Sequence, residues 1–372
     1  MQEDTTMKLN KIVITGGPCA GKTTALSWIE NAFTKRGYKV LFVPETATEL
    51  ISGGVAPWTC GTNVDYQKCQ VTLQLEKERL FEQAARTMPV DKVLIVCDRG
   101  ALDNKAYMNQ EEWTEVLNVL QKNETELRDG YDAVFHLVTA AKGAVEAYTL
   151  ANNAARYETV EQAAVMDDKL IAAWTGHPHL RIIDNSSDFE QKLERLISEI
   201  TAFLGEPDPF EIERKYLIEY PDLAYLDTLP NCTKVDIIQT YLKSAPDVQV
   251  RVRQRGNDGH YIYTRSEKRP ISETRRVEIE ERLSQDEYLR YLMDADTETH
   301  PIRKTRYCLA ENNLYYEIDI YPQWTTQAVL ELELKNESEE VIFPDGIRVI
   351  REVTGDKRYK NYSLAHHMME EG

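Results

Sequence analysis

The 372-residue chain lacks several features that would place it outside the cytoplasm. It contains no run of about 18 apolar residues, so the sequence predicts no membrane-spanning helix. Its six cysteines include no C-x-x-C pair and are typical of reduced thiols in a cytosolic protein. The N-terminus, Met1-Gln2-Glu3-Asp4, has the character of neither a signal peptide nor a transit peptide. We therefore expect a cytoplasmic protein.

Positive charge is also scarce relative to negative charge. The chain has 44 Lys and Arg against 62 Asp and Glu, which gives a net charge of −18. Residues 1–207 hold 21 basic and 30 acidic residues, and residues 208–372 hold the remaining 23 and 32, so each half carries −9. A chain this acidic is a poor general binder of nucleic acid. Its length exceeds that of a usual single domain, so two domains are expected.

The stretch from Gly16 to Thr23 reads G-x-x-x-x-G-K-T and stands between an apolar run and a helical pattern. Strand, glycine-rich loop and helix are together the context of a phosphate-binding loop, in which backbone amides and a helix N-terminus attract phosphate oxygens. Lys22 would reach the β- and γ-phosphates, and Thr23 would bind Mg²⁺. The predicted ligand is ATP or GTP. The predicted nucleotide-binding residues are Gly16, Gly17, Pro18, Cys19, Ala20, Gly21, Lys22, Thr23 and Thr24.

Apolar runs of strand length alternate with helical patterns over residues 8–206. This alternation predicts an α/β domain whose parallel sheet is covered on both faces. Asp98 follows the third strand and would face the magnesium ion at the carboxyl edge of the sheet, although an aspartate that caps a turn is the alternative. The predicted strands are 11–15, 38–43, 93–97, 133–138 and 180–183, and the predicted helices are 22–33, 66–86, 111–122, 163–174 and 189–204.

The segment Asp98-Arg99-Gly100 resembles the D-R-x segment of nucleotide and nucleoside kinases, and this half resembles kinase-like P-loop proteins of the small AAA-type ATPase group. The N-K-x-D motif by which small GTPases read guanine is absent. The resemblance implies an acceptor-binding or proton-accepting role for Glu45 and a lid role for Arg156, with Lys142 as a weaker candidate. A helix-start acid and a surface arginine are the alternatives. Trp58 either shapes an acceptor pocket or simply packs.

The character of the sequence changes after Gly205-Glu206-Pro207-Asp208-Pro209, a predicted linker. Period-two alternation replaces helical spacing, and the alternating residues are charged. Like charges on one face destabilise a sheet unless something neutralises them. A barrel whose charged face encloses a lumen could hold divalent cations on carboxylates and phosphate on basic residues, and a solvated face is the alternative. The alternating stretches are 211–215, 251–255, 278–280, 304–306, 317–319 and 331–335.

The order of these charges resembles the CYTH family of triphosphate tunnel metalloenzymes, whose E-x-E-x-K signature is matched by Glu211, Glu213 and Lys215. The likeness covers residues 210–367 and implies an antiparallel closed barrel of eight strands with flanking helices. The implied ligands of Mg²⁺ or Mn²⁺ are Glu211, Glu213, Glu331 and Glu333, and the implied phosphate contacts are Lys215, Arg251, Arg253, Lys304 and Arg306. Further lumen candidates are Arg255, Lys268, Glu278, Glu280, Glu317, Asp319 and Lys357.

The two halves together resemble proteins that fuse a P-loop ATPase to a CYTH domain. The leading hypothesis is an enzyme that hydrolyses a nucleoside triphosphate or transfers its γ-phosphate, and whose tunnel binds or hydrolyses triphosphate-containing compounds. The predicted catalytic residues are Lys22, Glu45, Asp98, Arg156 and Lys215. A nucleotide-dependent switch, whose tunnel holds an anion such as a phosphoinositide headgroup without turnover, is the alternative. Processing of RNA 5′ ends is a third hypothesis, which the acidic charge disfavours.

Overall fold

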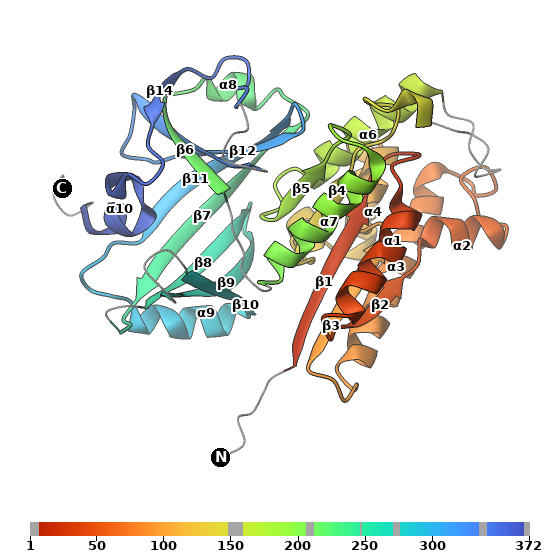
Figure 1. Cartoon of the computed structure of the whole chain (residues 1–372), viewed down its shortest axis with the longest axis horizontal. Helices are drawn as coiled ribbons and strands as arrows, with labels where there is room; N and C mark the ends of the chain where they lie inside the picture. Colours follow the sequence, from red (N-terminus) through yellow and green to blue (C-terminus); the bar gives the residue numbers. More distant parts are fainter. Residues whose placement is uncertain are drawn as a thin grey trace. The chain divides into compact units, whose positions relative to one another are not determined.

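The computed structural model divides the chain into two compact units, residues 1–203 and 204–372, and each unit is built around one β-sheet (Figure 1). The structure describes residues 7–147, 159–205, 212–245, 248–270, 276–334 and 341–367, with side chains except at 147, 212, 268–270, 276–279 and 367. The boundary between the units falls directly before the predicted linker.

Five parallel strands form the sheet of the first unit, in the order β2-β3-β1-β4-β5. Its central strands are fully buried apolar runs, such as Ile12–Ile14 and Val93–Cys97, because helices cover both faces of a parallel sheet. Strands β1 and β3 are neighbours, and Ile14 pairs with Asp98, so the loop after β1 and the end of β3 share one edge of the sheet. The strands are Lys8–Thr15 (β1), Lys39–Val43 (β2), Lys92–Asp98 (β3), Ala133–Leu137 (β4) and Leu180–Ile183 (β5).

The helices of the first unit lie on both faces of this sheet, with α1 packed against α7 and α3 packed against α4 (Figure 1). Each predicted strand and helix of this half is present within about three residues of its predicted bounds. The short elements α2, α5, η1 and η2 were not predicted, since each is too short to show a period. The helices are Lys22–Thr34 (α1), Thr46–Ser52 (α2), Asn63–Ala85 (α3), Ala101–Tyr107 (η1), Gln110–Leu120 (α4), Glu124–Arg128 (α5), Val145–Ala147 (η2), Val160–Trp174 (α6) and Phe189–Phe203 (α7).

Nine antiparallel strands form the sheet of the second unit, in the order β10-β9-β8-β7-β11-β12-β13-β6-β14. Most neighbours in the sheet are also neighbours in the chain, and β6 from the start of the unit lies between the late strands β13 and β14. The strands are Ile212–Glu219 (β6), Cys232–Leu242 (β7), Gln249–Asn257 (β8), His260–Pro270 (β9), Arg276–Leu283 (β10), Ile302–Glu311 (β11), Leu314–Ile320 (β12), Gln327–Leu334 (β13) and Val349–Glu352 (β14).

The predicted closed barrel of eight strands needs correction in two respects. The described residues form nine strands, and the edge strands β10 and β14 do not pair with each other. Strand β14 is only four residues long, and its register with β6 shifts between Val349 and Arg351. A short edge strand with such an irregularity bends away from its ladder and ends the pairing. The sheet is strongly curved (Figure 1), but strand pairing within the described ranges does not close it.

The two faces of this second sheet differ in chemistry. One face is an apolar core that packs under the short helix Leu223–Leu226 (α8), residues 341–347 and the helix Gln285–Tyr291 (α9). The other face carries the alternating charges and is called the charged face below. The C-terminal helix Asn361–His367 (α10) covers one end of the charged face, where Ala365 packs with Tyr241, Ile302, Tyr321 and Val329. The single-turn helices of this unit are Leu292–Asp294 (η3) and Lys357–Tyr359 (η4).

Candidate functional site

The turn between β1 and α1 forms the predicted phosphate loop. Its two sharpest bends are at Gly16 and Gly21, whose φ angles of 145° and 91° lie in the region that favours glycine. Lys22 reaches back across the loop, and its Nζ donates hydrogen bonds to the carbonyl oxygens of Gly16 and Gly17 at 2.9 and 3.2 Å. The lysine head is therefore held inside the loop.

Other carbonyl groups of the loop point to its outside. The hydroxyl of Thr139 donates to the Pro18 carbonyl, and Lys192 Nζ donates to the Ala20 carbonyl at 3.3 Å. A trans peptide group points its C=O and the following N–H in opposite directions. The amides that follow these two carbonyls therefore face the inside of the loop, where phosphate oxygens would accept from them.

Asp167 on α6 binds the backbone at the start of the phosphate loop. This fully buried carboxylate accepts from the amides of Gly17 and Thr139 at 3.0 and 3.1 Å. It also lies 3.0 Å from His136 Nε2 and 3.0 Å from Lys142 Nζ. Burial alone would raise the pKa of Asp167, but His136 and Lys142 hold it well below its usual range. Lys142, the weaker candidate for the lid role, thus forms an ion pair with α6.

The residues predicted to bind magnesium lie at this same edge. Thr23 is exposed in the first turn of α1, and Asp98 ends β3. Burial raises the pKa of Asp98, and its Oδ1 has no hydrogen-bond partner among the described residues. Burial and the nearby Arg99 lower the pKa of Lys22 to about 8. A buried carboxylate oxygen without a donor is what a cation would complete, so Thr23 and Asp98 fit a divalent metal.

Glu45 forms an ion pair with Arg99, whose Nε donates to Glu45 Oε1 at 2.6 Å. The Arg99 backbone is left-handed, with φ of 70°, and its Nη1 lies 3.5 Å from Asp103. Burial alone would raise the pKa of Glu45, but Arg99, the Thr48 hydroxyl and Lys22 lower it to about 2. A carboxylate with so low a pKa is a weak proton acceptor at neutral pH. The geometry therefore favours an orienting role for Glu45 over a role as general base.

In the part of the chain that the structure describes, three buried polar atoms, on Arg99 and at the start of α3, make no hydrogen bond. These are Arg99 Nη1, Tyr66 Oη and Gln67 Oε1. Burial raises the pKa of Tyr66 to about 12, and the charge of Glu45 contributes. Trp58 is 74% exposed in the preceding loop, so it does not pack into the core. Orphan donors and acceptors of this kind suit a small polar ligand.

Arg306 is the centre of the charged face in the second unit. Its guanidinium donates to Asp319 Oδ1 and Oδ2 at 2.6 Å each, to Glu331 Oε2 at 2.9 Å and to Glu317. Asp319 is fully buried and also pairs with Lys304. Despite burial, these carboxylates raise the pKa of Arg306 well above its usual value. Arg306 and Lys304 thus join strands β11, β12 and β13, and their charge is largely compensated within the protein.

The metal candidates lie on the neighbouring strands β6 and β13. Lys215 Nζ is 2.6 Å from Glu331 Oε1 and 3.8 Å from Glu213, and Glu213 pairs in register with Glu333. Burial and Glu331 raise the pKa of Glu213, whereas Arg306, Lys304 and Lys215 hold the pKa of Glu331 well below its usual range. Negative charge therefore accumulates around Glu213, and a divalent cation would relieve it.

The arginines of β8 lie on the same charged face. In register, Arg251, Arg253 and Arg255 stand opposite Tyr241, Gln239 and Ile237 of β7. Arg251 donates to Gln239 Oε1 at 3.2 Å, and on the far side of β8 the Ser266 hydroxyl donates to Glu280 at 2.8 Å. This row of three arginines is the strongest candidate for binding phosphate oxygens.

Some predicted residues cannot be placed in this way. Arg156 and Glu211 lie outside the described residues, as do the side chains of Lys268 and Glu278. Lys357 is exposed on η4. Within the described ranges, no group of three or more His, Cys, Asp or Glu side chains is arranged to hold a metal ion. The prediction of metal ligands in the tunnel therefore stays a prediction.

Comparisons with known proteins agree with the fold of the first unit. Residues 11–192 match the family model described as "AAA domain", so this part of the chain is an AAA-type P-loop domain, which supports nucleotide binding. No curated protein matches the chain. The chain thus joins an AAA domain to a curved antiparallel sheet with a charged face, as the two resemblances predicted.

Solved structures give weaker likenesses. The inorganic triphosphatase NE1496 is 26% identical, with 42% of this chain and 95% of that chain covered and a TM-score of 0.31. The PH1819 protein from Pyrococcus horikoshii OT3 is 20% identical, with 34% and 80% covered and a TM-score of 0.26. TM-scores this low support no functional conclusion for the present chain.

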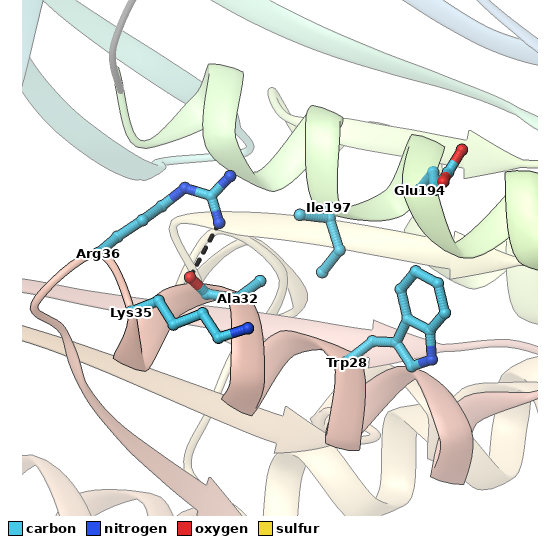
Figure 2. Close-up of a pocket in the computed structure, with 6 residues that line it drawn as sticks. All are labelled: Trp28, Ala32, Lys35, Arg36, Glu194 and Ile197. Atoms are coloured by element: carbon cyan, nitrogen blue, oxygen red, sulfur yellow. Dashed lines mark hydrogen bonds between the residues drawn. The ribbon is translucent and has the colours of Figure 1, made fainter.

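A pocket of about 500 Å³ lies between α1 and α7, away from the phosphate loop (Figure 2). It is lined by the second half of α1 with Arg36, and by Glu194 and Ile197 of α7. Figure 2 shows Arg36 hydrogen-bonded to the Ala32 carbonyl, at 2.9 Å, and Trp28 at the other end. Because the loop is at the opposite end of α1, this pocket is not the nucleotide site.

None of the described helices is long and apolar enough to cross a membrane.

Three residues of the candidate site were not predicted from sequence. Arg99 was noted only as part of the D-R-x segment, and its left-handed backbone left no trace in the sequence. Asp167 and Lys192 lie on helices 150 or more positions after the loop that they contact. The one signal in the sequence that could have identified Asp167 and Lys192 is a charged residue on the otherwise apolar side of an amphipathic helix.

Proposed function

We propose that the first unit binds ATP or GTP with Mg²⁺ and catalyses its hydrolysis or the transfer of its γ-phosphate. The observation that supports this most strongly is the loop between β1 and α1, in which Lys22 is held inside and the carbonyls of Pro18 and Ala20 are held outside. Such a loop presents backbone amides to an anion before the anion arrives, so little reorganisation is needed on binding.

Thr23 and Asp98 would hold the magnesium ion, because Asp98 has a buried oxygen without a donor at the edge where Thr23 begins α1. A divalent cation there would draw charge from the phosphate oxygens during transfer. Lys22 would contact the β- and γ-phosphates, and Thr24 the α-phosphate side of the loop. Arg156 would act from a lid.

Phosphoryl transfer to a small acceptor is favoured over simple hydrolysis by the resemblance of Asp98-Arg99-Gly100 to the D-R-x segment of nucleotide and nucleoside kinases. The buried Tyr66 Oη and Gln67 Oε1, which make no hydrogen bond within the described residues, support the same choice. In this reading Glu45 orients the Arg99 guanidinium, and Arg99 Nη1 contacts the acceptor.

The second unit, we infer, binds compounds with a linear triphosphate on its charged face and hydrolyses them with Mg²⁺ or Mn²⁺. Arg251 and Arg253 would bind phosphate oxygens, while Lys304 and Arg306 fix the carboxylates around them. Glu211, Glu213, Glu331 and Glu333 would hold the metal, and Lys215 would keep Glu331 in place. The metal would supply an activated water for attack on phosphorus.

A nucleotide-dependent switch remains the alternative class, with a charged face that retains an anion such as a phosphoinositide headgroup without turnover. The negative charge that Glu331 and Glu317 add around Glu213 favours catalysis, because an anion binder gains nothing from carboxylates beside its ligand.

Phosphate release from tripolyphosphate with Mn²⁺, measured by a malachite-green assay, tests the second unit. Wild type and Lys22→Ala should release phosphate at similar rates, and Glu213→Ala should not. Tight binding of tripolyphosphate without any release by the wild type would exclude the hydrolase and favour the switch.

Nucleotide binding by the full chain tests the first unit. Titration with Mg·ATP and Mg·GTP should give one strong binding event in wild type and Glu213→Ala, and none in Lys22→Ala. Undiminished affinity in Lys22→Ala would contradict the assignment of the loop.

A further inference from the structure

A buried lysine under the phosphate loop enters the function proposed above only through its hydrogen bond to the Ala20 carbonyl. Lys192 lies on the first turns of α7 and is only 2% exposed. Its ammonium donates to three oxygens, the carbonyls of Val138 and Ala20 at 2.7 and 3.3 Å and the side-chain oxygen of Asn185 at 2.7 Å. These three oxygens come from the loop after β4, the phosphate loop and the loop after β5.

Asn185 extends this junction. Its amide nitrogen donates to the carbonyl oxygens of Thr139 and Lys142, at 2.8 and 2.6 Å. Thr139 in turn holds the Pro18 carbonyl of the phosphate loop. The ammonium of Lys192 is therefore the centre of a network that fixes three loops at the carboxyl edge of the sheet.

Helix α7 touches the phosphate loop at a second point, one turn before Lys192. A Cβ placed on Gly21 would come within 2.4 Å of the Phe189 ring, so Phe189 packs directly against this glycine. Positions 189 and 192 share one face of the helix, since residues three apart are neighbours on its surface. The start of α7 thus braces the last two residues of the loop before Lys22.

We propose that Lys192 is a positioning residue for the nucleotide phosphates, because it holds the Ala20 carbonyl outside the loop and so keeps the Gly21 amide turned toward the phosphate. The proposal rests on the proposed function of the first unit. The buried ammonium also adds a fixed positive charge behind the amides. In a water-excluded environment such a charge attracts an anion more strongly than an exposed lysine does.

The side chain of Lys192 can gain or lose its proton near neutral pH. Burial lowers its pKa to about 8, with Asp167 and Asp184 opposing and Arg195 adding to this effect. A bound phosphate would favour the charged form and raise that pKa. Above pH 8, binding must therefore take up a proton at Lys192, and the affinity for nucleotide falls as the pH rises.

The test compares Lys192→Met with a matched variant, Arg195→Met, in the full-length protein. Arg195 lies on the same helix and binds Asp184 and Ser186, without a contact to the phosphate loop. Calorimetric titration with Mg·ATP at pH 7 should give about tenfold or greater loss of affinity for Lys192→Met and less than about twofold for Arg195→Met. Equal affinity in Lys192→Met and wild type would overturn the proposal.

The pH dependence separates positioning from a purely structural role. Between pH 7.5 and 9, the affinity of wild type should fall more steeply than that of Lys192→Met, because the variant has one titrating group fewer. Lys22 is present in both proteins, so the difference isolates Lys192. A weaker affinity in Lys192→Met with the wild-type pH profile would mean a structural role alone and would also overturn the proposal.

A second variant covers the case in which Lys192→Met does not fold. Asp184→Asn removes a carboxylate whose charge raises the pKa of Lys192, so it should move the fall in affinity to lower pH, and an unmoved profile would contradict the proposal. Lys22→Ala completes the series. If Lys22→Ala binds Mg·ATP as wild type does, the nucleotide site itself is misassigned. If Lys22→Ala loses binding and Lys192→Met keeps the wild-type affinity, only the role of Lys192 is refuted.

Discussion

The two units offer phosphate binding by different means. In the first, backbone amides face the inside of a loop, and a few side chains such as Thr139, Asp167 and Lys192 hold the outside. In the second, charged side chains form the site, and most of them pair with one another, as Arg306 does with three carboxylates. The backbone site is preorganised by its fold, whereas the side-chain site depends on charge balance across strands.

The two units therefore differ in how their buried carboxylates are hydrogen-bonded. Asp98 has a buried oxygen that no donor satisfies, and Asp319 accepts from both Lys304 and Arg306. Asp98 therefore keeps an oxygen that a ligand could bind, whereas Asp319 already has its partners within the protein. Substitution should thus affect folding at one position and function at the other.

The largest expected effect follows from this contrast. Asp319→Ala would leave the buried cations of Lys304 and Arg306 undercompensated, and should cost about 3–5 kcal/mol in the free energy of unfolding. Asp98→Asn should leave the stability equal or slightly higher, since burial disfavours the charge of Asp98 and its Oδ1 has no hydrogen-bond partner among the described residues. Urea unfolding of both variants measures this, and equal destabilisation would remove the distinction between the two carboxylates.

Lys22→Ala should have the next largest effect. Removing the cation inside the loop should weaken the binding of Mg·ATP about 100-fold, which corresponds to about 2.7 kcal/mol. Stability should change little, because the lysine head bonds only to loop carbonyls. A calorimetric titration supplies the affinity, and Lys169→Ala on α6 is a control that should bind like wild type.

A pH effect distinguishes the ion pair of the first unit. The pKa of Glu45 is depressed to about 2, below its unfolded value of about 4.5, so its contribution to stability is complete above pH 4.5 and is lost as the pH falls toward 2. Allowing for partial exposure, we expect about 2 kcal/mol. Glu45→Gln should be less stable than wild type at pH 6, and the difference should shrink at pH 3. A difference independent of pH would contradict the ion pair.

The smallest effect is expected at the arginine row. Because Arg251, Arg253 and Arg255 stand side by side on β8, loss of one should leave two, and Arg253→Ala should reduce the affinity for tripolyphosphate about tenfold. Arg303→Ala on β11 provides a control in the same unit, with no change expected, because Arg303 is exposed on the face opposite to Lys304 and Arg306. A loss of several hundredfold would mean that one arginine, and not the row, defines the site.

The sequence predicted the first unit almost completely, because strands buried on both faces are continuous apolar runs and the loop motif is local. The charged face was also predicted, since period-two charges report directly which residues share a face. The edge strand β14 was not, because its Val349–Glu352 stretch has no alternating pattern and its pairing depends on β6, more than 130 positions earlier.

Individual roles were harder to predict than positions. Glu45 was predicted to bind the acceptor or to accept a proton, and its partner Arg99, which lowers the pKa of Glu45, lies 54 residues away in the sequence. Arg306 was predicted to bind phosphate, and the carboxylates with which it pairs come from β12 and β13. Both roles stay predictions. Sequence spacing identifies which side chains share a face, and the pairing between strands decides which charges remain for a ligand.

The central claim is that the chain has two separate phosphate sites, one made of backbone amides and one of side chains. Calorimetric titration of the full chain with Mg·ADP and, separately, with tripolyphosphate tests it most directly in wild type, Lys22→Ala and Arg253→Ala. We predict that Lys22→Ala loses most of its affinity for Mg·ADP and keeps its affinity for tripolyphosphate, and that Arg253→Ala keeps its affinity for Mg·ADP and binds tripolyphosphate about tenfold more weakly. Loss of both ligands in either variant would contradict the account.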